Sequence, residues 1–227
     1  MPYIDSYYII LVLPAVLLSL WAQMKVKGTF AKYSGIFSSR GITGDEAARS
    51  ILRGSGITNV TVHPVAGELT DRFDPRDNTI GLSQPVYGNS SVAAIGVAAH
   101  ETGHAIQHAE GYLPIKLRAG ILPIANLGSA AAVPIAILGF VLGSASLVNF
   151  GILLFSAVVA FQLITLPVEF NASRRALAIL KSTYTLNEEE LEGAKKVLTA
   201  AALTYVAAAL TSLMSLLRLI LISRNRD

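Results

Sequence analysis

Four long apolar stretches constrain the fold of this chain more than any other feature of its sequence. A helix of about 20 mainly apolar residues is long enough to cross the hydrocarbon core of a bilayer. Inside lipid no water can satisfy backbone N–H and C=O groups, so a single stretch of this kind must form a helix. The stretches cover residues 7–22, 121–142, 146–166 and 198–222. The sequence therefore predicts a mainly α-helical membrane protein with about four transmembrane helices.

The composition agrees with a membrane protein that carries a modest water-soluble part. Hydrophobic residues make up 52% of the 227 residues and charged residues 15%, whereas about 25% of the residues of a typical soluble domain are charged. The chain has no cysteine, so disulfides and thiolate metal sites are excluded. It also has no run rich in Lys and Arg, and we therefore expect no nucleic acid among its partners.

The apolar stretches divide the chain into five segments. We interpret the first as an uncleaved anchor, because the only charged residue before its apolar part is Asp5, whereas a signal peptide usually begins with positive charge. Only a few small residues separate the second and third stretches, which predicts a tight hairpin. The predicted segments are an N-terminal anchor (1–22), an α+β segment (23–118), a transmembrane hairpin (119–167), a helix followed by a connector (168–197) and a C-terminal transmembrane helix with its tail (198–227).

The α+β segment shows the signals of a small mixed domain. Short β-branched or alternating runs predict strands, and Gly or capping residues predict where helices begin and end. The first half of the last helix is almost wholly apolar or small, so we expect this helix to be buried. In chain order the segment should form a helix from about Thr43 to Gly54, strands at residues 59–63 and 79–82 with a turn-rich stretch (71–78) between them, and a helix from about 89 to 110.

The last of these helices contains the run His100-Glu101-Thr102-Gly103-His104, an HExxH motif. Residues four apart lie on one face of a helix, so both imidazoles can reach one metal ion. Glu101 lies about 100° round the helix from His100, where it can take a proton from a metal-bound water. This arrangement is typical of zinc hydrolases. Two hydrogen-bonded core histidines beside a salt-bridged glutamate are the alternative interpretation.

A catalytic zinc needs a third protein ligand, and the candidates are His108, Glu110, His63 and Glu169. His108 shares the helix face with His100, but eight residues separate them, which corresponds to about 12 Å of helical rise. One ion cannot hold both of them together with His104 on a straight helix. Glu110 lies six residues after His104 and is rotated off the shared face.

Glu169 is the best of these candidates. It lies just where the third apolar stretch ends, and a carboxylate at that depth is costly unless it has a partner. The transmembrane hairpin returns the chain to the side that it left, so residues 168–197 share one face of the membrane with residues 23–118. The alternative is an interfacial glutamate paired with Arg174 or Arg175.

The distribution of positive charge predicts the orientation in the membrane, because Lys and Arg are enriched in cytoplasmic loops. Ten Lys and Arg residues lie in residues 23–118 and five in 168–197, whereas only Arg218, Arg224 and Arg226 lie elsewhere. We therefore expect a multi-pass protein of the inner (plasma) membrane with its catalytic side in the cytoplasm. The basic tail is at odds with this orientation, since four spans place both termini outside.

Three runs stand out in combination: residues 98–107 around the HExxH motif, Asp74-Pro75 with Leu82-Ser83, and residues 166–176. Together they resemble the YugP-like family, the neutral zinc metallopeptidases of bacterial membranes, and the resemblance covers nearly the whole chain. The layout is also distantly similar to HtpX-type and CAAX-prenyl-type membrane zinc proteases. The resemblance implies zinc peptidase activity and a small zincin-like catalytic part that carries the HExxH helix.

In these more distant proteases the third zinc ligand lies in a Glu-x-x-Ala-Asp motif on a later helix, and the Asp orients a zinc-bound histidine. The matching residues in this sequence are Glu169, Ala172 and Ser173. Because Ser173 stands in place of the Asp, the resemblance implies that support for the histidine comes from another residue, such as Asn171.

The sequence thus predicts a zinc-dependent endopeptidase, a hydrolase whose Zn²⁺ is bound by His100, His104 and Glu169. Zinc lowers the pKa of its bound water toward ~7, and Glu101 accepts the proton and later passes it to the leaving amine. The substrate would be an extended segment of a membrane or membrane-proximal protein, paired with an edge strand near residues 79–83.

Two other classes of function fit the sequence less well than a peptidase. A non-catalytic metal-binding scaffold in the membrane would keep both histidines, but it has no need of Glu101. A transporter or channel is disfavoured, because the apolar stretches carry almost no charge that could form an ion path.

Overall fold

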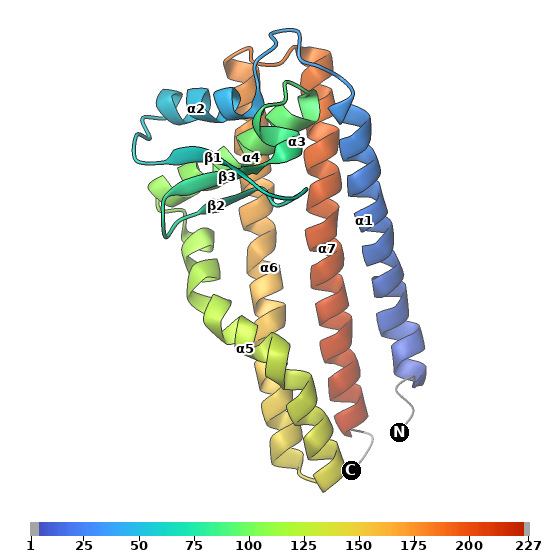
Figure 1. Cartoon of the computed structure of the whole chain (residues 1–227). Helices are drawn as coiled ribbons and strands as arrows, with labels where there is room; N and C mark the ends of the chain where they lie inside the picture. Colours follow the sequence, from blue (N-terminus) through green and yellow to red (C-terminus); the bar gives the residue numbers. More distant parts are fainter. Residues whose placement is uncertain (1–4, 225–227) are drawn as a thin grey trace. The chain divides into compact units, whose positions relative to one another are not determined.

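The computed structural model describes residues 5–224 of the chain (Figure 1). These residues form a mainly helical structure with a small sheet. The elements in chain order are a π-helical turn η1 (Tyr8–Val12), α1 (Leu13–Ser34), α2 (Gly44–Gly54), β1 (Thr61–Val65), β2 (Arg72–Asp74), β3 (Thr79–Ser83), α3 (Gln84–Tyr87), α4 (Val92–Ala109), α5 (Leu113–Leu142), α6 (Ala145–Ser182) and α7 (Glu188–Arg224).

Four long apolar helices confirm the helical membrane-type architecture predicted from the sequence. The helical stretch of η1 with α1, and helices α5, α6 and α7, contain 27, 30, 38 and 37 residues, and each is long and apolar enough to cross a membrane. The helices are longer than the apolar stretches themselves. In particular, α6 continues through Pro167, although a proline removes one backbone N–H from the helix. The residues that follow Pro167 are therefore helical, Glu169 among them.

The chain folds into two compact units. Within the described residues, one consists of residues 5–23, 116–167 and 203–224, and we call it the span unit. The other consists of residues 24–115 and 168–202 and contains the whole sheet, so we call it the sheet unit.

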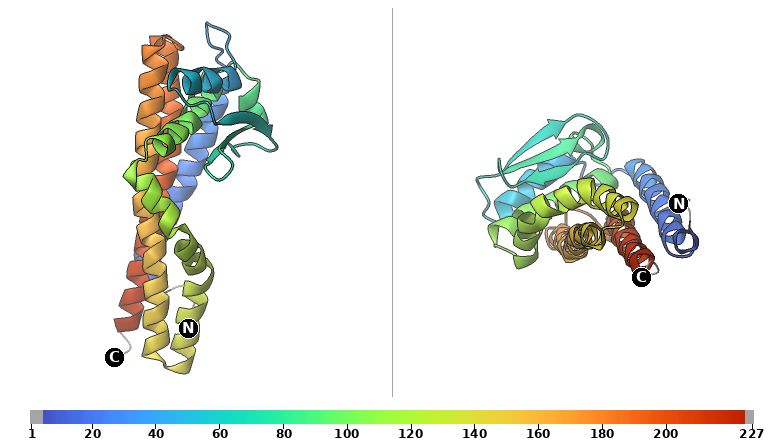
Figure 2. Two further views of the ribbon diagram at one scale, coloured as in Figure 1. Left: turned by 90° about the vertical axis from the view of Figure 1, so that its left-hand side faces the viewer. Right: turned by 90° about the horizontal axis from the view of Figure 1, so that it is seen from below.

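In the span unit, α5 and α6 form the tight hairpin expected from the sequence and lie side by side (Figure 2). Small residues allow this close approach: a Cβ on Gly128 would lie 2.5 Å from the Leu154 carbonyl oxygen, and a Cβ on Gly151 would lie 2.8 Å from that of Ala132. Small residues are common wherever transmembrane helices pack backbone to backbone.

Arg218, the charged residue within the apolar part of α7, has a partner inside the span unit. The Arg218 guanidinium lies 2.7 Å from the Asp5 carboxylate and over the ring of Tyr8. A charged side chain in a span is costly unless it is paired, so this ion pair lets α7 carry an arginine without implying an ion path.

The sheet corrects one expectation from the sequence. Its strand order is β1-β3-β2, with β1 parallel and β2 antiparallel to β3. Thr79–Ser83 is therefore the central strand and not an edge strand. The residues predicted to be only turn-rich supply the missing partner, because Arg72–Asp74 pairs with β3 before the turn begins. The edges of this sheet are β1 and β2.

Helix α4 is the buried helix that the sequence predicts, and the sheet and α2 pack against it (Figure 1). The Ser91 side chain caps its N-terminus by accepting a hydrogen bond from the Ala94 N–H. Its first residues are at most 1% exposed, namely Val92, Ala93, Ala94, Ile95, Ala98 and Ala99. The predicted cap of α2 is also present, since the Thr43 N–H donates to Glu46 Oε2 at 2.9 Å.

Candidate metal centre

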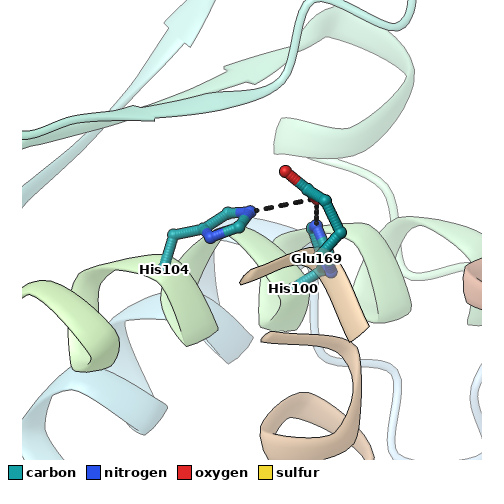
Figure 3. Close-up of side chains that lie close together, drawn as sticks. All are labelled: His100, His104 and Glu169. Atoms are coloured by element: carbon teal, nitrogen blue, oxygen red, sulfur yellow. Dashed lines mark hydrogen bonds and ion pairs between the residues drawn. The ribbon is translucent and has the colours of Figure 1, made fainter. Parts of the chain in front are cut away.

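Three side chains from two helices meet in the sheet unit (Figure 3). Helix α4 provides His100 and His104, and α6 provides Glu169. Glu169 Oε2 lies 3.2 Å from His100 Nε2 and 3.4 Å from His104 Nε2. Among the described residues these three form the one group of His and carboxylate side chains with metal-ligand spacing. The HExxH helix and the end of the third span are therefore close in space as well as in the predicted topology.

The close approach of α4 and α6 depends on a glycine between the two histidines. A Cβ on Gly103 would lie only 2.7 Å from the carbonyl oxygen of Ala172, which is itself fully buried. Without that Cβ, the backbones can pack in direct contact. Glu169 and Ser173 lie four residues apart on α6, one turn of helix, so this contact brings both of them to the histidines.

Ser173 contacts the far side of the His100 ring, with 3.1 Å between Ser173 Oγ and His100 Nδ1. The expectation that support must come from another position, such as Asn171, was therefore wrong for this histidine. A serine hydroxyl is shorter than an aspartate, but the packing at Gly103 brings α6 close enough for it to reach the ring. Residue types alone suggest that His100 lacks a partner at position 173, because the sequence does not give the distance between Ser173 and the His100 ring.

His104 has a partner that the sequence analysis missed. Its Nδ1 lies 3.0 Å from Oε1 of Gln107, a fully buried side chain one turn further along α4. The available signal was weak: a polar residue three positions after a candidate ligand, on a helix expected to be buried.

Glu101 lies beside the three side chains on α4 and is 8% exposed. Burial is the main cause that raises the pKa of its carboxyl above the usual range; neighbouring carboxylates add to this shift, and charge on the two imidazoles opposes it. Within residues 5–224, no hydrogen bond or ion pair to another side chain occupies the Glu101 carboxylate. It is thus a buried carboxyl next to the candidate metal position and available for proton transfer.

The other ligand candidates from the sequence lie outside this group. Glu110 forms an ion pair with Arg175, with 2.7 Å between Oε2 and the guanidinium nitrogen. The ring of His108 packs against Phe73, with 5.7 Å between the ring centroids, and His63 lies on β1. Arg175, one of the two arginines that the alternative interpretation pairs with Glu169, therefore pairs with Glu110.

Asp71 is a second residue that the sequence analysis undervalued, since it looked like a turn residue. Its carboxylate accepts hydrogen bonds from the Ser83 N–H at 2.7 Å and from the Ser83 hydroxyl at 2.9 Å. Burial raises the pKa of Asp71, against the effect of these hydrogen bonds. Asp71 thus occupies the backbone donor at the end of β3, just beyond the last residue that pairs with β2.

Known proteins resemble this chain over nearly its whole length. The family model described as "Putative neutral zinc metallopeptidase" matches residues 8–224. A relative from Bacillus subtilis (strain 168), named "Putative membrane protease YugP", is 52% identical over 218 residues, which cover 96% of this chain and 97% of the relative. No solved structure matches the chain. With a family model that spans nearly all of its length, the chain belongs to this family of zinc metallopeptidases.

Proposed function

We propose that the protein is a membrane-integrated zinc endopeptidase that hydrolyses peptide bonds with Glu101 as the general base. The observation that carries the proposal is the convergence of His100, His104 and Glu169 beside a buried carboxyl. Family membership supports the same conclusion.

The three side chains fit a zinc ion in both chemistry and spacing. Two atoms that are each bound about 2.1 Å from one tetrahedral zinc ion lie about 3.4 Å apart, and Glu169 Oε2 lies 3.2 and 3.4 Å from the two imidazole nitrogens. The ligand set is two histidines and one glutamate, as in other zinc peptidases that leave a fourth position for water. When bound, zinc would supply Lewis acidity and a water of lowered pKa.

The remaining chemistry falls to residues of the chain. Glu101 would accept a proton from the attacking water and return it to the leaving amine, the usual task of a general acid–base residue. Its raised pKa suits this double role, because the carboxyl must be able to hold the proton between the two steps. A scaffold that only bound metal would not need this side chain.

A zincin-like arrangement would bind the substrate as an extended strand on a free edge of the sheet. Since β3 is paired on both sides, the choice lies between β1 and β2. Helix α4 packs against β2, whereas β1 packs against α2. We therefore assign the substrate strand to the free edge of Arg72–Asp74, the edge strand that adjoins the helix with the two histidines.

The orientation of the chain and the position of the site together suggest the substrate class. Fifteen of the 18 Lys and Arg residues lie in residues 23–118 and 168–197, which favours a cytoplasmic catalytic side in the plasma membrane. Arg218, one of the remaining three, is neutralised by Asp5. Glu169 lies on α6, a helix long and apolar enough to cross a membrane, so the site would act on membrane proteins or membrane-proximal segments.

The decisive experiment compares the purified protein with Glu101→Gln, which keeps size and hydrogen bonding but removes the base. Zinc content should remain at about one ion per chain, as a single three-ligand site implies, while peptide cleavage falls by about 10²-fold or more. Glu189→Gln, an exposed glutamate in the first turn of α7, is the matched control and should cleave at the wild-type rate.

The result that would overturn the proposal is cleavage by Glu101→Gln at the wild-type rate. If the wild-type protein binds zinc but cleaves neither a broad peptide library nor membrane-protein substrates, the metal-binding scaffold becomes the better interpretation.

A further inference from the structure

We propose that Gln107 is a positioning residue that fixes the tautomer of His104, and that Asn171 and Arg175 hold Gln107 in the required orientation. The inference rests on the proposed metal site, because it concerns which nitrogen of His104 is free to bind the ion. Ligating histidines usually donate their second ring N–H to a partner that sets their orientation.

All three hydrogen bonds of the Gln107 amide are formed inside the protein. Its Oε1 lies 3.0 Å from His104 Nδ1, and its Nε2 lies 2.8 Å from the Val168 carbonyl oxygen and 3.0 Å from Asn171 Oδ1. The side chain is fully buried. The amide oxygen therefore contacts α4, and the amide NH₂ group donates to two residues of α6.

The orientation of this amide follows from the Val168 carbonyl. A backbone carbonyl oxygen only accepts, so the Gln107 atom that faces it must be the NH₂ group. The atom that faces His104 is then the amide oxygen, which also only accepts. His104 Nδ1 must carry a hydrogen to meet it, and the lone pair of the neutral ring is left on Nε2, the nitrogen 3.4 Å from Glu169.

The same reasoning extends one step further along α6. Asn171 Oδ1 accepts from Gln107 Nε2 at 3.0 Å and from Arg175 Nε at 2.7 Å. A guanidinium can only donate, so Arg175 fixes the Asn171 amide with its oxygen toward Gln107. Arg175 is held in turn by its ion pair with Glu110. A chain of one-way hydrogen bonds thus runs from a surface ion pair to a candidate zinc ligand.

The partner of His100 lacks this directionality. The Ser173 hydroxyl can either donate or accept, so its contact with His100 Nδ1 is compatible with both tautomers. His104 is therefore the ligand whose binding nitrogen is specified by its surroundings. We expect loss of the Gln107 amide to weaken zinc binding more than loss of the Ser173 hydroxyl.

The test measures zinc affinity by competition with a chelator. Gln107→Met keeps length and burial but removes the acceptor, and it should weaken zinc binding by about 10- to 100-fold, the usual effect of losing a partner of a ligating histidine. Thr102→Val is the matched control: this residue is also fully buried on α4 and loses one hydrogen bond, to the Ala98 carbonyl, but it has no link to an imidazole. Its zinc affinity should stay within about 2-fold of wild type, well below the loss expected for Gln107→Met.

Two further measurements separate positioning from packing. Asn171→Asp retains the oxygen that accepts from both neighbours and should bind zinc nearly as wild type, whereas Asn171→Leu should bind it more weakly. ¹⁵N spectra of the histidine rings, with His104 assigned through His104→Gln, should show a hydrogen on Nδ1 of His104 in the wild type and loss of that single form in Gln107→Met.

Each outcome bears on a different statement. If Gln107→Met binds zinc as tightly as wild type, or if Thr102→Val loses as much affinity, the positioning role is wrong while the proposed function stands. If Asn171→Asp loses as much affinity as Asn171→Leu, the role of Asn171 as an acceptor is wrong. If the wild-type protein binds no zinc, the proposed function itself fails.

Discussion

At the scale of single residues, Glu169 is the side chain on which the candidate site depends most. One of its oxygens lies within 3.4 Å of a nitrogen from each histidine, and its side chain is only 3% exposed. Buried carboxylates need partners, and the two imidazoles are partners here that the proposed ion would join. Replacement of Glu169 should therefore affect metal binding before it affects any other property of the site.

We expect the His104→Ala/Glu169→Ala double variant to lose zinc, because a single histidine remains to bind the ion. Metal analysis after a chelator wash should give about one zinc per chain for the wild type and a small fraction of that for the variant. His108→Ala is the control, since His108 packs against Phe73 outside the group. Full occupancy in the double variant would rule out these ligands.

Much of the candidate site could be predicted from the sequence alone, because helical periodicity is a local property. The spacing of His100 and His104 is readable from five consecutive letters, and the structure places both rings on one face of α4. Glu169 lies 65 positions after His104 in the sequence, so it was reached only through the count of spans and the resemblance to a family. Gln107 was missed because the sequence does not show which groups a neutral amide side chain contacts.

At the scale of elements, the contact between α4 and α6 decides the geometry of the site. Gly103 lies against the Ala172 backbone, and both neighbouring turns carry candidate ligands. A backbone carbonyl cannot move aside as the end of a flexible side chain can, so any added atom at position 103 must separate the helices.

Gly103→Ala should therefore destabilise the protein by about 1–3 kcal/mol, the usual cost of overpacking a core, and should also lower zinc occupancy. Thermal unfolding in detergent and metal analysis measure the two effects. Gly28→Ala is the matched control, because a Cβ there meets no atom within 4 Å. Wild-type zinc occupancy together with wild-type stability for Gly103→Ala would show that α4 and α6 tolerate a wider spacing.

Prediction of elements succeeded where the signal was local and failed where it came from a partner. The cap at Thr43 and the boundaries of α4 follow from residues next to them in the chain. Strand β2 has only three residues and lies among turn-forming ones, and it exists because β3 offers it an antiparallel neighbour. Likewise α6 passes through Pro167, although proline alone predicts an end to the helix.

At the scale of the whole molecule, the testable property is the orientation of the chain in the membrane. The chain contains no cysteine, so single introduced cysteines report on sidedness without background. Ser39→Cys, exposed in the sheet unit, should resist an impermeant thiol reagent in intact cells, and Ser146→Cys, exposed at the start of α6, should react. Both should react after the cells are lysed. The reverse pattern would place the catalytic side outside.

In the proposed peptidase, the short free edge of β2 would affect the selection of substrates. Three residues of strand, about 10 Å at the usual rise per residue, offer backbone hydrogen bonds and little else. Any segment that can become extended is able to form these hydrogen bonds, whatever its sequence. A segment that is already helical, or paired in a sheet of its own domain, is not. The peptidase would then distinguish substrates by their folded state. It would cleave damaged or unassembled proteins and spare intact proteins of the same sequence.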